Sequence, residues 1–175
     1  FKLKYYFLFV KKIVLYIKSQ LISFGIIFYK AIFNTKFFYP KQDLSKDFAL
    51  IHSKASLKNI EKLNLDLNYY YDDINLKLKI NKNAISFYKI LNVVDYLNLI
   101  FKSFILTHNL FKKLAHTGKA MVGDFGTIQA LNFFSPRIGH YIIINNAYNK
   151  IFKHNSNIKF YSGERESRYG ILAMN

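Results

Sequence analysis

The chain has 175 residues, of which 51% are hydrophobic, and it carries a formal net charge of +16. This length allows one domain, or one domain with an extended arm. The charge indicates an anionic partner, either nucleic acid or an anionic membrane surface, and argues against a soluble metabolic enzyme. The absence of Cys excludes disulfides and thiolate metal sites.

Motifs typical of enzymes are missing from the sequence. The five His residues are scattered and form no spacing such as HExxH, and there is no GxxxxGKS, GxGxxG or GxSxG. We therefore predict a protein that is not an enzyme, with no catalytic residues, no metal site, no cofactor and no small-molecule substrate.

Residue usage points to the source of the gene. Lys, Asn, Ile, Phe and Tyr are abundant, and Arg137, Arg165 and Arg168 are the only arginines. Because these are amino acids of A+T-rich codons, the bias suggests an organellar genome. We accordingly predict a mitochondrial protein of the matrix.

The positive charge is concentrated in two segments. Residues 1–42 contain eight lysines and no acidic residue, whereas residues 43–100 contain eight lysines and seven acidic residues. Residues 101–161 contain eight basic residues and one acidic residue, Asp124. Because a surface without a partner usually mixes the two signs, at least one of the basic segments is predicted to contact phosphate.

The N-terminal arm, residues 1–40, is basic and strongly apolar, and we expect it to be helical up to Tyr39-Pro40. A membrane span over residues 13–33 would contain Lys18, which costs about 2.5–3.5 kcal/mol near the centre of a bilayer. Three interpretations remain open: a tilted span, a helix that packs on protein while its lysines reach RNA, and a targeting or assembly segment.

The middle region, residues 41–90, is expected to mix helical and extended structure. Ser56 is a candidate N-cap for a helix from Leu57. Residues 74–80, INLKLKI, alternate as in a strand. From Ala84 to Tyr96 the apolar spacing is helical, and the adjacent carboxylates at 72–73 indicate a loop or an N-cap rather than a metal site.

The stretch from Leu97 to Ile144 combines a helix with glycine-punctuated apolar runs. Thr107 is a candidate N-cap and Gly118 a candidate C-terminal stop. Beyond Gly118, strands are predicted at 119–122, 127–128 and 141–144, with a tight turn at Gly123-Asp124. The predicted class is α+β: a helical N-terminal part, then a helix pair with a small antiparallel sheet over residues 91–145, then an exposed tail over 146–175.

These residues resemble the small-subunit ribosomal protein S-four family, whose RNA-binding domain also occurs in RNA-modifying enzymes. The similarity is carried by Leu97-Asn98-Leu99-Ile100-Phe101-Lys102, Thr107, Phe111-Lys112-Lys113-Leu114-Ala115, Ala120-Met121-Val122-Gly123-Asp124 and Gly139-His140-Tyr141-Ile142-Ile143-Ile144. The family's Arg is Lys112 here, its usual His is Thr117, and its Asn-Gly turn is Gly123-Asp124. The segment LFKKLAHTGKAM also resembles small-subunit protein seven, which implies the same broad function.

The resemblance implies an S-four-like domain that packs helices against the rRNA backbone. The candidate RNA-binding residues are Lys102, Thr107, Lys112, Lys113, Thr117, Lys119 and Arg137. We predict a structural rRNA-binding protein of the mitochondrial small ribosomal subunit, whose partners are rRNA and neighbouring ribosomal proteins, with a membrane as the lesser candidate. The alternative is an organelle-encoded, membrane-anchored subunit of a respiratory or ATP synthase complex.

Overall fold

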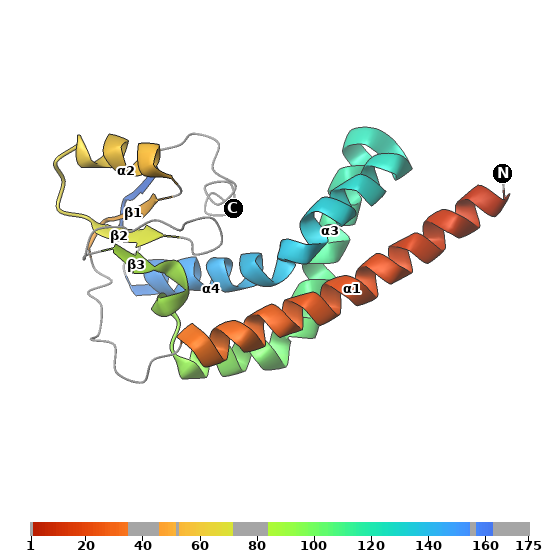
Figure 1. Ribbon diagram of the computed structural model, residues 1–175, viewed down its shortest axis with the longest axis horizontal. Coiled ribbons are helices and arrows are strands. Elements are labelled where there is room, and N and C mark those ends of the chain that lie inside the picture. Colours follow the sequence, from red (N-terminus) through yellow and green to blue (C-terminus); the bar gives the residue numbers. More distant parts are fainter. Residues whose placement is uncertain (1, 35–45, 52, 72–83, 155–156, 163–175) are drawn as a thin grey trace. The chain divides into compact units, whose positions relative to one another are not determined.

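The computed structural model describes residues 2–34, 46–51, 53–71, 84–154 and 157–162. Over these residues the chain combines helices with a small sheet, which confirms the α+β class (Figure 1). It divides into two compact units of discontinuous sequence. Unit 1 contains Phe1–Phe33 and Val93–Ile143, and unit 2 contains Asn34–Asn92 and Ile144–Asn175.

Unit 1 is built from helices. Its elements are α1 (Lys2–Asn34), α3 (Val93–Phe134), the short 3-10 helix η2 (Ser135–Arg137) and the start of α4 (Ile138–His154). The helical arm predicted from the sequence is confirmed over α1, whereas Tyr39-Pro40 lies outside the described residues. Leu15 of α1 packs with Ile128 and Leu131 of α3 in a buried cluster that Leu8, Phe111, Leu114 and Ala115 border.

Helix α3 reverses direction at Gly123. In a straight helix Ala115 and Thr127 would lie about 18 Å apart. Instead, the Thr127 hydroxyl donates to the carbonyl of Ala115 at 3.4 Å. Gly123 has a φ of +70°, which a glycine adopts without the steric cost that a Cβ imposes. A turn at Gly123 was predicted, but both of its flanks are helical.

The predicted strands of residues 91–145 are wrong. Residues 119–122 and 127–128 belong to α3, and residues 141–144 belong to α4. Short apolar runs suit a buried helix as well as a strand, and here tertiary packing selects the helix. The helix stop predicted at Gly118 is also wrong, because this residue lies inside α3. A Cβ at Gly118 would lie 2.9 Å from the Cα of Thr127, so the glycine permits close packing of the two limbs.

Unit 2 contains a parallel sheet in place of the antiparallel sheet that was predicted. Within the described residues it has four strands in the order β3-β2-β1-β4, and all neighbours are parallel. The strands are β1 (Phe48–Ile51), β2 (Asn68–Tyr71), β3 (Ala84–Ser86) and β4 (Phe160–Ser162). Helix α2 (Lys54–Glu61) connects β1 to β2 as the crossover that a parallel pair requires (Figure 1).

The central strand β1 is covered on both faces. Ala49 packs with Ile60 of α2 and with Leu67. Phe48 points to the other side, where its ring lies 6.2 Å from that of Tyr148 in the later part of α4. All four residues of β1 are buried, which explains its unbroken apolar sequence, Phe-Ala-Leu-Ile.

Three further predictions for unit 2 are corrected. The N-cap of α2 is Ser53, whose side chain accepts from the backbone N–H of Ser56 at 3.0 Å, so the helix begins three residues before the predicted start. The segment from Ala84 forms β3 and the 3-10 helix η1 (Phe87–Ile90) before α3 begins. The predicted tail instead continues α4 and supplies β4, with Ala147, Tyr148 and Ile151 buried. Residues 74–80 and 163–175 lie outside the described residues.

The reversal of α3 predicts how two glycine substitutions change the free energy of unfolding. We expect Gly123→Ala to lower the free energy of unfolding by about 1–2 kcal/mol, because a Cβ is strained at positive φ. The control is Gly25→Ala in α1, where a Cβ meets nothing within 4 Å. That variant should gain about 0.5–1 kcal/mol from helix propensity. Urea unfolding followed by circular dichroism measures both, and equal shifts in the same direction would contradict the reversal.

Candidate functional site

All seven candidate RNA-binding residues lie in unit 1. Arg137 belongs to η2, and the other six lie on α3 before its reversal: Lys102, Thr107, Lys112, Lys113, Thr117 and Lys119. All four lysines and Thr117 are exposed, whereas Thr107 is buried and Arg137 is half-buried.

The four exposed lysines of α3 form a basic stripe, consisting of Lys102, Lys112, Lys113 and Lys119. Positions 98, 102, 105, 109, 112, 116 and 119 follow one another at intervals of three or four residues, so they lie along one side of the helix, and all of them are exposed. From Lys102 to Lys119 the stripe extends about 25 Å. The sequence of α3 has no acidic residue between Asp95 and Asp124, so no carboxylate of this segment neutralises the stripe.

Thr107 and Arg137 do not belong to the basic stripe, because Thr107 is buried and Arg137 contacts Phe133. Thr107 sits in the middle of α3, so its predicted role as an N-cap is wrong. Its Oγ1 is buried and has no hydrogen-bond partner among the described residues. The Nη1 of Arg137 donates to the carbonyl of Phe133 at 2.6 Å, and the guanidinium lies 4.6 Å from the centre of the Phe133 ring. Arg137 therefore satisfies a carbonyl at the C-terminal end of α3.

The interior of unit 1 is polar where α1 meets α3. Ser19, Gln20 and Ser23 of α1 are buried, as is Ser103 of α3. The side-chain amide of Gln20 donates to the carbonyl of Phe104 at 3.2 Å and to the Tyr16 hydroxyl at 2.9 Å. The side of α1 that faces protein thus carries hydroxyl and amide groups beside the buried Leu15 and Ile27.

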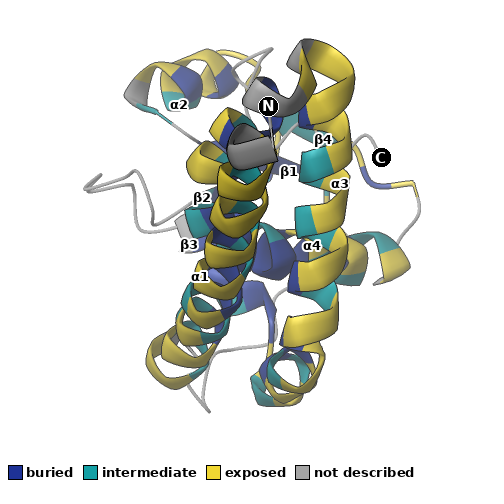
Figure 2. Ribbon diagram, turned by 90° about the vertical axis from the view of Figure 1, so that its right-hand side faces the viewer, coloured by how far each residue is buried: buried dark blue, intermediate teal, exposed yellow. Residues whose placement is uncertain are grey.

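A second exposed side of unit 1, formed mainly by α1, is apolar. Figure 2 shows α1 exposed along most of its length. We define the apolar face by these residues: Val10, Val14, Ile17, Leu21, Phe28 and Ile32 of α1, and Leu97, Phe101 and Phe104 of α3. All of them are exposed, with Leu21 at 66% and Phe101 at 81%. By length and composition, the part of α1 from Tyr5 to Phe33 is sufficient to cross a membrane.

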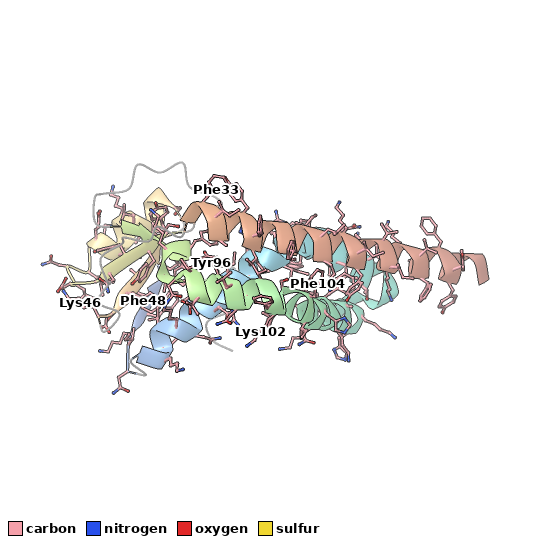
Figure 3. All side chains as sticks on the ribbon, turned by 90° about the horizontal axis from the view of Figure 1, so that it is seen from below. Phe33, Lys46, Phe48, Tyr96, Lys102 and Phe104 are labelled. Carbon is pink, nitrogen blue, oxygen red and sulfur yellow. The ribbon has the colours of Figure 1, made fainter. Side chains whose placement is uncertain are left out.

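An aromatic row joins the two helices of the apolar face. The Phe24 ring stacks on Phe28 of α1 at 6.1 Å and on Phe104 of α3 at 5.7 Å. Figure 3 shows Phe104 on the side of α3 toward α1, whereas Lys102 projects on the other side. This face was not predicted from the sequence, because which side of α1 is covered depends on α3, which comes some sixty residues later in the chain.

One histidine of α3, His108, contacts α1. His108 Nδ1 lies 3.2 Å from the Tyr16 hydroxyl, and the two rings meet edge to face. His108 therefore packs against α1. Among the described residues, no group of His, Asp and Glu is arranged to hold a metal ion.

Comparison with protein-family models, with curated proteins and with solved structures found no match to this chain. We therefore infer the function from the basic stripe, from the apolar face and from the sequence resemblance described above.

Burial of the Thr107 hydroxyl predicts how its replacement changes the free energy of unfolding. Thr107→Val replaces an unpaired buried hydroxyl by a methyl group of similar size, so we expect the free energy of unfolding to stay unchanged or to rise by up to about 1 kcal/mol. Thr117→Val is the control, since it makes the same change at an exposed position of the same helix. Had Thr107 been an N-cap, its replacement would cost about 1 kcal/mol. A loss of that size in urea unfolding, absent from Thr117→Val, would contradict the structure.

Proposed function

We propose that this protein is a structural rRNA-binding protein of the mitochondrial small ribosomal subunit, and that the basic stripe of α3 contacts the phosphate backbone. The observation that carries the proposal is the row of Lys102, Lys112, Lys113 and Lys119 on one exposed side of a helix whose sequence lacks acidic residues there. The protein acts without catalysis, by neutralising phosphates and holding RNA segments in place.

The geometry of the stripe favours recognition of shape over recognition of sequence. Lysine is a flexible point charge, so it neutralises phosphate without the bidentate base contacts that arginine makes. The deep, narrow major groove of an A-form helix hides the base edges, and such helices are bound mainly through phosphates and 2′-hydroxyls. Four phosphate contacts predict a plot of log affinity against log salt with a slope of roughly −3.

The resemblance of residues 97–144 to the S-four family supports the same class of function. In that comparison Lys112 takes the place of the family's Arg, and Lys102, Lys113 and Lys119 are the other implied phosphate contacts. A small antiparallel sheet does not form part of the proposal, because residues 119–122, 127–128 and 141–144 are helical. What we retain from the resemblance is a cationic helix that lies against rRNA.

The stripe makes a direct prediction for RNA binding. We expect Lys112→Gln with Lys113→Gln to weaken binding to an A-form RNA duplex equally for unrelated duplex sequences, because phosphate contacts carry no sequence information. Each lost contact should reduce the salt slope by about one, so the double variant should lose about two. Fluorescence anisotropy at a series of salt concentrations measures both quantities.

The matched control is Lys58→Gln with Lys62→Gln, two exposed lysines of unit 2 that give the same change in net charge. This variant should keep the wild-type salt slope. If the two double variants behave alike, the effect is one of net charge, and Lys112 and Lys113 do not contact the RNA.

Sedimentation tests the ribosomal assignment itself. In a magnesium-containing gradient of mitochondrial lysate, we expect the tagged full-length protein to migrate with the small ribosomal subunit, and the Lys112→Gln, Lys113→Gln variant to shift toward lighter fractions. Migration with a respiratory or ATP synthase complex instead would favour the alternative, a membrane-anchored subunit, and would refute the ribosomal proposal.

A further inference from the structure

From the apolar face of unit 1 we infer a second interaction surface: α1 docks in the plane of an anionic lipid bilayer, with its outward side chains among the acyl chains and its lysines at the headgroups. This surface is separate from the basic stripe and has a different partner, so the inference stands or fails independently of the proposed function.

Helix α1 buries polar side chains, together with Leu15 and Ile27, and exposes large apolar ones. Ser19 and Ser23 are completely buried, and Gln20 is only 8% exposed, whereas Val14 and Leu21 are 57% and 66% exposed. A helix at the surface of a soluble protein shows the opposite pattern, with its apolar stripe toward the core. Polar groups that face protein, with large apolar groups facing outward, indicate that the outer medium is apolar.

Close helix packing around α1 supports the same conclusion. A Cβ at Gly139 of α4 would lie 2.9 Å from the Cα of Ser23, so a glycine and a serine bring these two backbones together. Small residues at helix contacts are typical of bundles that are held together by close packing and hydrogen bonds instead of by burial of large apolar side chains. Leu15 and Ile27 of α1 are buried in the unit, whereas the α1 side chains of the apolar face remain available for another partner.

The apolar face extends over two helices, so it is broad enough to contact a membrane surface. The stacked rings of Phe24, Phe28 and Phe104 continue it from α1 onto α3, where Leu97 and Phe101 extend it. Exposed apolar patches on this scale are rare on isolated soluble proteins, and they mark contacts with membranes or with other proteins.

Charge selects an anionic bilayer and an in-plane orientation. The sequence of α1 contains no acidic residue. Two of its lysines, Lys11 and Lys18, are exposed; they are seven residues apart and follow one border of the apolar face, where their side chains reach headgroups when the helix lies flat. A helix that crossed the bilayer would instead place Lys18 near the middle of the candidate span Tyr5–Phe33, which is unfavourable. A protein partner would have to supply both an apolar groove and an anionic rim.

Vesicle flotation of the full-length protein tests the inference. We expect binding to vesicles of phosphatidylcholine and phosphatidylglycerol in equal parts, and weaker binding to phosphatidylcholine alone. Ile17→Asp with Leu21→Asp should reduce the partition coefficient at least tenfold, because both side chains lose their apolar contact with lipid. The control, Leu63→Asp with Leu65→Asp, makes the same change at two exposed leucines of unit 2 and should bind as the wild type does.

Two further variants separate this surface from the RNA site. Lys11→Gln with Lys18→Gln should remove most of the preference for anionic vesicles. Lys112→Gln with Lys113→Gln should leave vesicle binding through the apolar face intact, while Ile17→Asp with Leu21→Asp should leave binding to duplex RNA intact. Vesicle binding that depends on Lys112 and Lys113 and not on Leu21 would overturn the inference.

The orientation is tested by fluorescence, since the chain contains no Trp. Leu21→Trp should show a blue-shifted emission with anionic vesicles and be quenched by lipids brominated near the headgroups. Asn98→Trp, at an exposed position of α3, should remain in water. Quenching of Leu21→Trp only by lipids brominated at the chain ends, together with resistance to carbonate extraction, would mean that α1 spans the bilayer and would overturn the in-plane orientation. An absence of vesicle binding, with the fold intact by circular dichroism, would assign the face to a protein partner.

Discussion

Close approach of helix backbones is the constraint on which unit 1 depends. Gly118 lets the two limbs of α3 meet at Thr127, and Gly139 lets the start of α4 meet Ser23 of α1. At both places a Cβ would lie 2.9 Å from a backbone atom of the neighbouring segment. Besides these contacts between small residues, Leu15 and Ile27 of α1 are buried in the unit, whereas Val14, Ile17 and Leu21 are left exposed. The result is a helical unit with an apolar core that also buries Ser19, Gln20 and Ser23, while many large apolar side chains of α1 stay exposed.

The two surfaces of unit 1 follow from this arrangement. The first limb of α3 packs against α1 through Phe104 and Phe111, which leaves Lys102, Lys112, Lys113 and Lys119 on exposed positions of the helix. Several exposed apolar residues of α3 lie earlier in the helix, and Leu97, Phe101 and Phe104 among them belong to the apolar face. A protein with these features is suited to connect two partners: a polyanion along the stripe and an apolar phase along α1.

The structural features that could be predicted from the sequence are those determined by residues close together in the chain. The helix of the N-terminal arm, the turn at Gly123 and the exposed lysines of α3 were predicted, because periodicity, glycine conformation and charge act within a few residues. The strands predicted after Gly118 were wrong, because short apolar runs such as Tyr141–Ile144 fit either structure until their neighbours are known. The role of Thr107 was misjudged for a related reason. A hydroxyl before an apolar run suggests a cap, but α3 begins at Val93, well before it. The parallel sheet was missed, because β1 and β4 pair across more than a hundred residues of sequence.

That last pairing has a consequence for how the chain folds during synthesis. Phe48 at the start of β1 is partnered by Phe160 in β4, and Leu15 of α1 packs with Ile128 and Leu131. Neither unit can therefore complete its core until most of the chain has left the ribosome that makes it, which is the situation of a protein with high contact order. During that interval α1, which is made well before α3 and α4, has none of its partner helices and exposes both of its sides. Synthesis close to a membrane or with a chaperone at the exit site would shield it, and the nascent chain should aggregate more readily than its finished surface would indicate.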